Sequence, residues 1–397
     1  MFLSLGIILT IGFLGGFLFE KIHLPKLIFY LILGILLSPT VFNIIDPQLL
    51  EISSYLRQIA LVIILTRSGL SLDFKALKKI GLPAILLSFI PASFEMIGIA
   101  IFAPIILKIS ITEALLMGCV LAAVSPAVVV PRMIKLKNEG YGVDKNVAQL
   151  IMAGSSADDI YVIVLFYSFL KILQNSSFNP IGLIQIPLSF IIGVLLGICV
   201  GLLISYIFKK IKLSSIHMVI IFLGISFLLL ALEDILKLYI SISSLISIIV
   251  IGIIILKIVP NSAKEVQNKY NGMWNVFEIL LFALVGCIAD VSLVFNGYGV
   301  LILLTIFIGL IFRSLGVIIC LIKTNFNIKE KLFIIISYLP KATVQASIGP
   351  IALAYGLSCG EMVLTAAVIA ILLTAPIGAI LMDVSYKHLL NKQNSEI

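Results

Sequence analysis

The sequence predicts an all-α integral membrane protein with thirteen transmembrane helices. Of its 397 residues, 61% are hydrophobic and only 12% are charged, whereas a soluble domain carries about 25% charged residues. The mean hydropathy is +1.24. Charged clusters and Gly, Pro or Asn residues also cut the chain into apolar stretches long enough to cross a bilayer. The polar residues are too few to cover a water-facing surface, so we expect lipid to surround most of the chain.

Each apolar stretch is expected to be helical, because backbone polar groups that face lipid must be bonded within their own segment. A helix needs about 20 apolar residues to cross the hydrocarbon core. The expected helices cover residues 2–19, 26–42, 55–71, 82–107, 111–134, 147–172, 187–208, 216–233, 238–257, 273–290, 298–322, 331–356 and 361–384. The first stretch lacks the basic region and cleavage site of a secretory signal, so we expect a retained helix. Together the helices are expected to form a single transmembrane domain, residues 1–397.

The basic residues alternate between the two sets of loops. Twenty of the 27 Lys and Arg residues lie in the odd-to-even loops or the C-terminal tail, and only Lys108, Lys171 and Lys237 lie in the other loops. Lys and Arg gather on the cytoplasmic side of membrane proteins. The pattern predicts a multi-pass plasma-membrane protein with its N-terminus outside and its C-terminus in the cytoplasm. It also explains the net charge of +8 without a nucleic-acid partner.

Five ionisable residues are expected near the middle of the membrane: Glu95, Asp158, Asp159, Arg313 and Lys341. Their depth follows from the rise of 1.5 Å per helical residue. Each buried charge costs at least about 2.5–3.5 kcal/mol on insertion scales, so such groups mark function. Three acids and two bases leave room for one bound cation. A permanent Glu95–Arg313 ion pair that only braces the helices is the alternative for those two residues.

The adjacent carboxylates Asp158 and Asp159 are the centre of this group. Burial and mutual repulsion favour the protonated form of at least one of them. Such a group holds a proton at neutral pH and releases it when a small cation arrives. Because carboxylate oxygens suit hard cations, the pair is predicted to bind a monovalent cation and a proton in competition, without a cofactor.

Two predicted helices carry prolines near mid-depth, Ser125-Pro126 in the fifth and Pro340-Lys341 in the twelfth. A proline removes an amide donor and frees a carbonyl. Broken helices in corresponding positions of two halves mark transporter binding sites. We therefore add Ser125, beside the first break, to the expected ion site.

The two breaks also predict internal symmetry. The fifth and twelfth helices are seven apart, an odd number, so their repeats have opposite orientations. Glu95 precedes Pro126 by 31 residues, and Arg313 precedes Pro340 by 27. We infer inverted five-helix repeats over about residues 26–172 and 238–384.

Three motifs resemble the NHA-type sodium/proton antiporters of the monovalent cation:proton antiporter superfamily. They are Ala122-Ala123-Val124-Ser125-Pro126-Ala127-Val128-Val129-Val130-Pro131, Ser156-Ala157-Asp158-Asp159 and Leu339-Pro340-Lys341-Ala342-Thr343-Val344-Gln345-Ala346. The resemblance implies the antiporter fold, with two crossing broken helices and a six-helix core that moves as an elevator in a homodimer. It also implies that Asp159 is the principal cation ligand, with Asp158 beside it. Ala157 departs from the family, where a bulkier residue is common.

The resemblance also implies roles for the remaining residues. Lys341 corresponds to the core lysine, Thr343 lines the site, and Glu95 with Arg313 corresponds to a buried acid–arginine pair. Exchange is expected to be electrogenic if Lys341 releases and rebinds a proton, and electroneutral if one aspartate holds Lys341 charged.

Na⁺(Li⁺)/H⁺ antiport is the leading functional hypothesis, and K⁺/H⁺ antiport is the alternative because charge counts do not rank Na⁺ against K⁺. An organic-anion symporter of the same architecture is disfavoured by the excess of acids at the centre. An enzyme is disfavoured because the sequence has no HExxH motif, Ser/His/Asp arrangement or Gly-rich phosphate loop.

Overall fold

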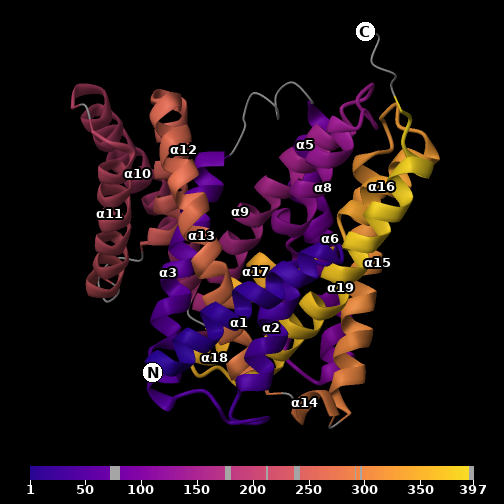
Figure 1. Cartoon of the computed structure of the whole chain (residues 1–397), viewed down its shortest axis with the longest axis horizontal. Helices are drawn as coiled ribbons and strands as arrows, with labels where there is room; N and C mark the ends of the chain where they lie inside the picture. The colour runs from indigo at the N-terminus through magenta and orange to yellow at the C-terminus, as the bar shows by residue number, and fades with distance from the viewer. Residues whose placement is uncertain are drawn as a thin grey trace. The chain divides into compact units, whose positions relative to one another are not determined.

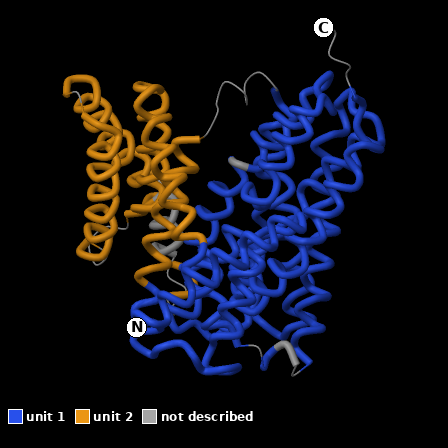
Figure 2. The backbone as a smooth tube through the Cα atoms, in the orientation of Figure 1, with its two compact units in different colours: residues 1–54, 73–170, 279–397 blue, residues 55–72, 171–278 orange. Residues whose placement is uncertain are grey.

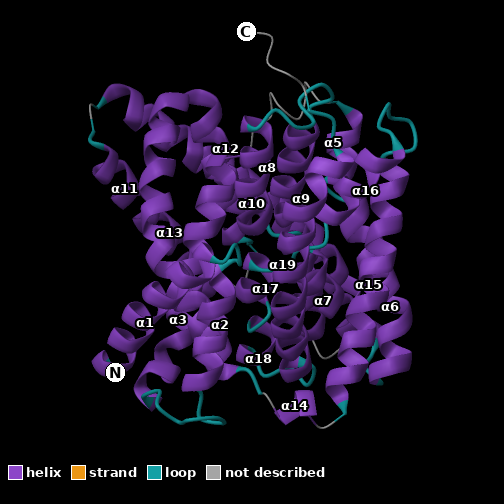
Figure 3. Cartoon of the chain, turned by 45° about the vertical axis from the view of Figure 1, so that its right-hand side comes forward, coloured by secondary structure: helices purple, strands orange, loops and turns teal. Residues whose placement is uncertain are grey.

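The computed structural model describes residues 1–71, 81–174, 180–211, 213–236, 242–290, 292–295 and 297–392. Within these ranges the chain is almost entirely helical and forms no strand (Figure 3). An isolated β-bridge joins Tyr141 to Lys392. The all-α class predicted from hydropathy is therefore confirmed for the described chain.

Figure 1 shows the described helices in the order of the chain. Their bounds are α1 Phe2–Lys21, α2 Lys26–Leu37, α3 Pro47–Ser71, α5 Leu82–Leu87, α6 Ile90–Leu107, α7 Ile111–Ala122, α8 Pro126–Asn138, α9 Val147–Gln174, α10 Pro180–Lys210, α11 Ser215–Leu236, α12 Ser244–Ile258, α13 Pro260–Ile288, α14 Ser292–Phe295, α15 Tyr298–Cys320, α16 Ile328–Ser337, α17 Thr343–Ile348, α18 Ile351–Ala354 and α19 Gly360–Leu389.

Ten helical segments of the described chain are long and apolar enough to cross a membrane. Three shorter apolar segments are Lys26–Leu37, Ser244–Ile258 and Thr343–Ala354. Each of these segments overlaps one of the apolar stretches expected from the sequence. The chain is a multi-pass membrane protein, and the count of thirteen spans stays a prediction.

One expected span is interrupted, and one expected helix begins earlier, each for a local reason. The stretch 82–107 is interrupted, since α5 ends at Leu87 and α6 begins at Ile90. Pro91 lacks the N–H that would bond the Leu87 carbonyl, so the helical ladder stops there. The helix expected from residue 273 already begins at Pro260. Its polar first turns still bury Ala263, Val266 and Tyr270 at helical spacing, which a search for uniformly apolar residues overlooks.

The chain divides into two compact units (Figure 2): Met1–Ser54, Asp73–Leu170 and Ile279–Ile397 form the first, and Tyr55–Leu72 with Lys171–Glu278 form the second. In the first unit α19 packs on α2, α7, α8, α15, α16, α17 and α18, while α6 lies against α7 and α15. The interrupted helices α7–α8 and α16–α17 thus lie among the most enclosed elements of this unit.

In the second unit α10 packs along α12. Gly193, Gly197 and Gly201 repeat every four residues, and a Cβ on each would lie 2.7, 2.7 and 2.9 Å from atoms of α12 or its N-cap. Small residues at this spacing let two membrane helices approach closely. Because these three glycines have no side chain, α10 can lie this close to α12.

Contacts in the first unit agree with the expected alternation of loops. Hydrogen bonds join segments expected in the cytoplasm: Arg132 to the His23 carbonyl, Lys145 to the Asn325 carbonyl and the Gly142 N–H to the Asn391 carbonyl. Ser358 and Glu113, expected at the opposite surface, also bond to each other. Segments assigned to one side of the membrane therefore meet in the folded unit.

Candidate functional site

The first interruption separates α7 from α8. Helix α7 ends at Ala122, residues 123–125 are extended, and α8 begins at Pro126. Pro126 has no N–H to donate to the Ala122 carbonyl four residues earlier. The guanidinium of Arg313 donates to that carbonyl instead. The Arg313 side chain thus supplies the hydrogen bond that the Ala122 carbonyl cannot receive from Pro126.

The second interruption lies between α16 and α17, over residues 338–342. The two interruptions are bonded to each other, since the Ser125 N–H donates to the Pro340 carbonyl at 2.8 Å. The Lys341 N–H donates to Oγ1 of Thr374 on α19 at 2.8 Å. The two irregular segments therefore meet and are anchored to the helix at the centre of the unit.

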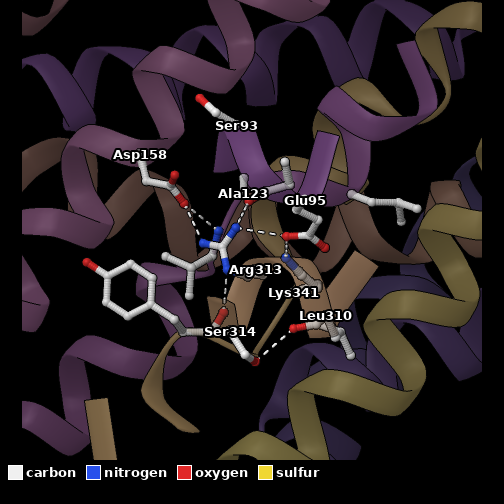
Figure 4. A network of polar contacts seen from close by, with 12 residues as sticks. Ser93, Glu95, Ala123, Asp158, Leu310, Arg313, Ser314 and Lys341 are labelled. Atoms are coloured by element: carbon white, nitrogen blue, oxygen red, sulfur yellow. Dashed lines mark hydrogen bonds and ion pairs between the residues drawn. The ribbon is translucent and has the colours of Figure 1, made fainter. Parts of the chain in front are cut away.

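Arg313 on α15 lies between two acids (Figure 4). Its Nη1 is 2.9 Å from Oε2 of Glu95, and its Nη2 is 2.8 Å from Oδ2 of Asp158. Its Nε donates to the Tyr338 carbonyl at 2.6 Å. The Lys341 Nζ lies 2.6 Å from the same Glu95 oxygen. The four charged side chains are at most 1% exposed and form one connected network.

Lys341 therefore pairs with Glu95 and not with an aspartate. Electroneutral exchange was expected if one aspartate holds Lys341 charged. In the structure the partner of Lys341 is Glu95 instead. The side-chain depths estimated from sequence brought Lys341 and Glu95 to the same level, but they did not indicate which groups would pair. Arg313 forms ion pairs with both Glu95 and Asp158, whereas the sequence suggested only the Glu95–Arg313 pair.

The formal charges of this network sum to zero. Glu95 and Asp158 supply two negative charges, and Arg313 and Lys341 supply two positive charges. Asp159 is the acid that remains: it is 4% exposed, and within the described ranges no cationic side chain forms an ion pair with it. The excess of one negative charge inferred from the sequence therefore falls on Asp159.

Three oxygens beside this network are buried and accept no hydrogen bond from the described residues. They are Oδ1 of Asp158, Oδ1 of Asp159 and Oγ of Ser125. Ser125 is the N-cap of α8, and its side chain makes no capping bond. Buried polar atoms are normally bonded, so an unbonded set requires an explanation. Oxygens of this kind suit a hard monovalent cation or a proton.

The remaining expected site residue, Thr343, is the first residue of α17 and is buried. The hydrogen bonds of the described chain do not join its side chain to either aspartate. Sequence reasoning did not single out Tyr338, Gln345 or Thr374. The Tyr338 carbonyl accepts from Arg313, Gln345 donates to the Ala123 carbonyl, and Thr374 accepts from the Lys341 N–H. Gln345 does lie within a motif that the family resemblance used, which was the available signal for it.

Sequence comparison relates the chain to known transporters. A family model described as "Sodium/hydrogen exchanger, transmembrane" matches residues 6–383. Sodium/hydrogen exchanger 9B2 of Mus musculus is 35% identical over 397 residues, which cover 95% of this chain and 72% of that protein. The Homo sapiens protein of the same name is 36% identical over 348 residues, covering 86% of this chain and 65% of that protein. The chain thus spans 65% to 72% of the length of these relatives.

A solved structure is similar in fold. The sodium proton antiporter MjNhaP1 from Methanocaldococcus jannaschii superimposes with a TM-score of 0.82 over 97% of each chain, at 21% sequence identity. This similarity extends over 97% of this chain and supports the fold that the family resemblance implied.

Proposed function

The chain belongs to the sodium/hydrogen exchanger family, and from this premise we propose that it exchanges Na⁺ or Li⁺ for protons across the membrane by alternating access at Asp158 and Asp159. Members of this family are transporters, and the chain is a transporter rather than an enzyme. Sodium and protons are accordingly its proposed substrates.

One observation carries the proposal. Asp159 is a buried carboxyl outside a network whose other charges balance. A buried ion without a partner costs several kcal/mol, so ionised Asp159 is strongly disfavoured unless a cation accompanies it. A proton or a metal cation each brings the centre to neutrality. Their competition for one carboxylate is the coupling that exchange needs.

The neighbouring oxygens complete the proposed cation site. Oδ1 of Asp158 and Oγ of Ser125 are buried and unbonded, as is Oδ1 of Asp159. Arg313 and the Val124 N–H both bind the other oxygen of Asp158, so they orient its carboxylate without occupying Oδ1. In this proposal Thr343 lines the site, and Glu95 and Lys341 balance the charge of Arg313 and Asp158.

The architecture supports the wider proposal. The helices that carry Glu95 and Arg313, α6 and α15, pack against each other, and the two interruptions share a backbone hydrogen bond. These are contacts that an inverted repeat over about residues 26–172 and 238–384 would bring together. We also propose a homodimer in the plasma membrane, with the N-terminus outside and the C-terminus in the cytoplasm, as the distribution of basic residues indicates.

The test is exchange in proteoliposomes with an imposed pH gradient. Addition of Na⁺ or Li⁺ is expected to dissipate the gradient, and Asp159→Asn is expected to abolish this response. Asp234→Asn removes an exposed acid of the second unit and is expected to transport normally. Full activity of Asp159→Asn, or a gradient insensitive to Na⁺ and Li⁺, would refute the proposal. A response to K⁺ alone would replace it with K⁺/H⁺ exchange.

A further inference from the structure

The peptide between Pro340 and Lys341, at the second interruption, is held from both sides. Its carbonyl accepts the Ser125 N–H at 2.8 Å, and its N–H donates to Oγ1 of Thr374 on α19 at 2.8 Å. The carbonyl and N–H of a planar trans peptide point in opposite directions, and the described chain is trans throughout. Thr374 and Ser125 therefore lie on opposite sides of this peptide, and the Thr374 bond fixes the direction of the carbonyl that Ser125 uses.

The hydroxyl of Thr374 has one defined arrangement. It donates to the Ala370 carbonyl at 2.7 Å, one turn earlier on α19, so its oxygen is left to accept the Lys341 N–H. Both Thr374 and Lys341 are buried, and Lys341 lies beyond the end of α16 at Ser337, where the helical ladder no longer supplies an acceptor. A buried N–H that loses its acceptor is costly, so Thr374 decides how the peptide is oriented.

Gly378 completes the contact of α19 with this peptide. It follows Thr374 by four residues and therefore lies on the same face of the helix. A Cβ at position 378 would be 2.5 Å from Cγ of Pro340, so the missing side chain gives the proline ring its space. α19 thus holds the main chain of the second interruption, whereas the ion pair with Glu95 holds the Lys341 side chain.

The orientation of this peptide bears on the proposed cation site through Ser125. The Ser125 N–H is tied to the Pro340 carbonyl, and its hydroxyl is one of the buried oxygens that accept no hydrogen bond from the described residues. A change in the direction of the carbonyl moves the backbone of Ser125 and with it the hydroxyl. Cavity size and ligand flexibility decide selectivity between cations of equal charge, so a fixed hydroxyl favours the ion whose radius it fits.

We propose that Thr374 is a positioning residue that sets the cation preference of the exchanger: it fixes the Pro340–Lys341 peptide, and this peptide fixes the Ser125 oxygen. The inference rests on the proposed exchange of Na⁺ or Li⁺ for protons and deepens it. Without the Thr374 bond the oxygen is held less rigidly, and a loosely held ligand discriminates less between small cations. Loss of the bond therefore weakens cation binding and lowers the preference for the favoured cation.

The test compares Thr374→Val with the parent protein in proteoliposomes at one alkaline pH, with the apparent KM measured for Li⁺, Na⁺ and K⁺. Valine keeps the branched shape but accepts no hydrogen bond. The apparent KM of the preferred cation is expected to rise about fivefold, the ratio that corresponds to one net hydrogen bond, and the KM values of the other cations are expected to rise less. The maximal rate is expected to be retained. Thr374→Ser keeps the hydroxyl and is expected to restore the parent values.

Two further variants and a second measurement sharpen the comparison. Gly378→Ala displaces the Pro340 ring without changing the Thr374 hydroxyl, and the same loss of preference is expected. Thr365→Val is the matched control, because Thr365 is buried on the same helix and donates only to the Glu361 carbonyl at 2.8 Å. Protection against thermal unfolding by each cation in detergent reports binding without turnover and is expected to lose its preference in parallel.

The outcomes separate this inference from the proposed function. Unchanged KM ratios in Thr374→Val and Gly378→Ala, with only the maximal rate or the stability lowered, would overturn the positioning role alone, and so would equal defects in Thr374→Ser and Thr374→Val. If Thr374→Val does not fold, the comparison of Gly378→Ala with Thr365→Val decides in its place. A parent protein that exchanges no cation would overturn the proposed function and this inference with it. Altered ratios in Thr374→Val and Gly378→Ala, absent in Thr365→Val, support the positioning role.

Discussion

The ion pair between Glu95 and Lys341 gives a quantitative test of the buried network. Their Oε2 and Nζ atoms lie 2.6 Å apart, and both side chains are 1% exposed. Glu95→Gln removes the carboxylate that Lys341 contacts and one of the two that Arg313 contacts. Lys341→Met leaves Glu95 paired with Arg313 at 2.9 Å. The two single variants are therefore expected to differ in cost.

Removing one partner of a buried ion pair costs about 3–5 kcal/mol because the other charge is left uncompensated. We expect Glu95→Gln to lie in this range. We expect Lys341→Met to cost only about 1.5–3 kcal/mol, the range for a hydrogen bond to a charged group. The double variant leaves no unpaired Lys341, so its cost should fall below the sum of the two by about 2 kcal/mol, within the range for residues in contact.

The assay is the free energy of unfolding by denaturant titration in detergent micelles, with thermal midpoints as a second readout. The control cycle pairs Glu95→Gln with Thr365→Val, since Thr365 on α19 donates only to the carbonyl of Glu361. This control should be additive within about 0.5 kcal/mol. Equally small coupling between Glu95 and Lys341 would show that the pair does not stabilise the fold in the way described.

Two further predictions concern packing and capping. Gly34→Ala would place a Cβ against the backbone of Ala283, and we expect destabilisation by about 1–3 kcal/mol; Gly224→Ala, which meets nothing within 4 Å, should be neutral, and equal thermal midpoints would contradict this reasoning. Asn327→Ala removes the acceptor of the Glu330 N–H at 2.8 Å and should cost about 1 kcal/mol. Asn327→Ser should restore most of that stability in the same thermal assay, and a failure to do so would argue against capping.

Much of the fold could be predicted because its causes are local. Hydropathy locates the membrane helices, and a proline acts on the carbonyl four residues before it, as Pro126 does on Ala122. The distribution of Lys and Arg orders the loops. Boundaries were less predictable where composition and structure diverge, as at the polar first turns of α13, which are helical although they are too polar for the hydrocarbon core.

Within the site the Glu95–Arg313 pair was expected from the sequence and is present, but the other pairings could not be predicted, since depth along a helix gives no direction around it. Glu95, Arg313 and Lys341 were placed at one level, but their partners depend on how α6 faces α15 and how the two interruptions cross. Lys341 lies in an irregular segment, where helical periodicity says nothing about side-chain direction. The Lys341–Glu95 pair, and the position of Asp159 outside the ion-pair network, become visible only once the helices are packed together.

The bond between the two interruptions has a consequence for how such a site can change over evolutionary time. It uses only the N–H of residue 125 and the carbonyl of residue 340, so every residue type except proline at position 125 preserves it. The hydroxyl of Ser125, by contrast, is buried and forms no hydrogen bond with the described protein. In the proposed site, substitution at position 125 is therefore expected to alter ion preference while the two interruptions remain joined, which makes this position a starting point for engineered selectivity.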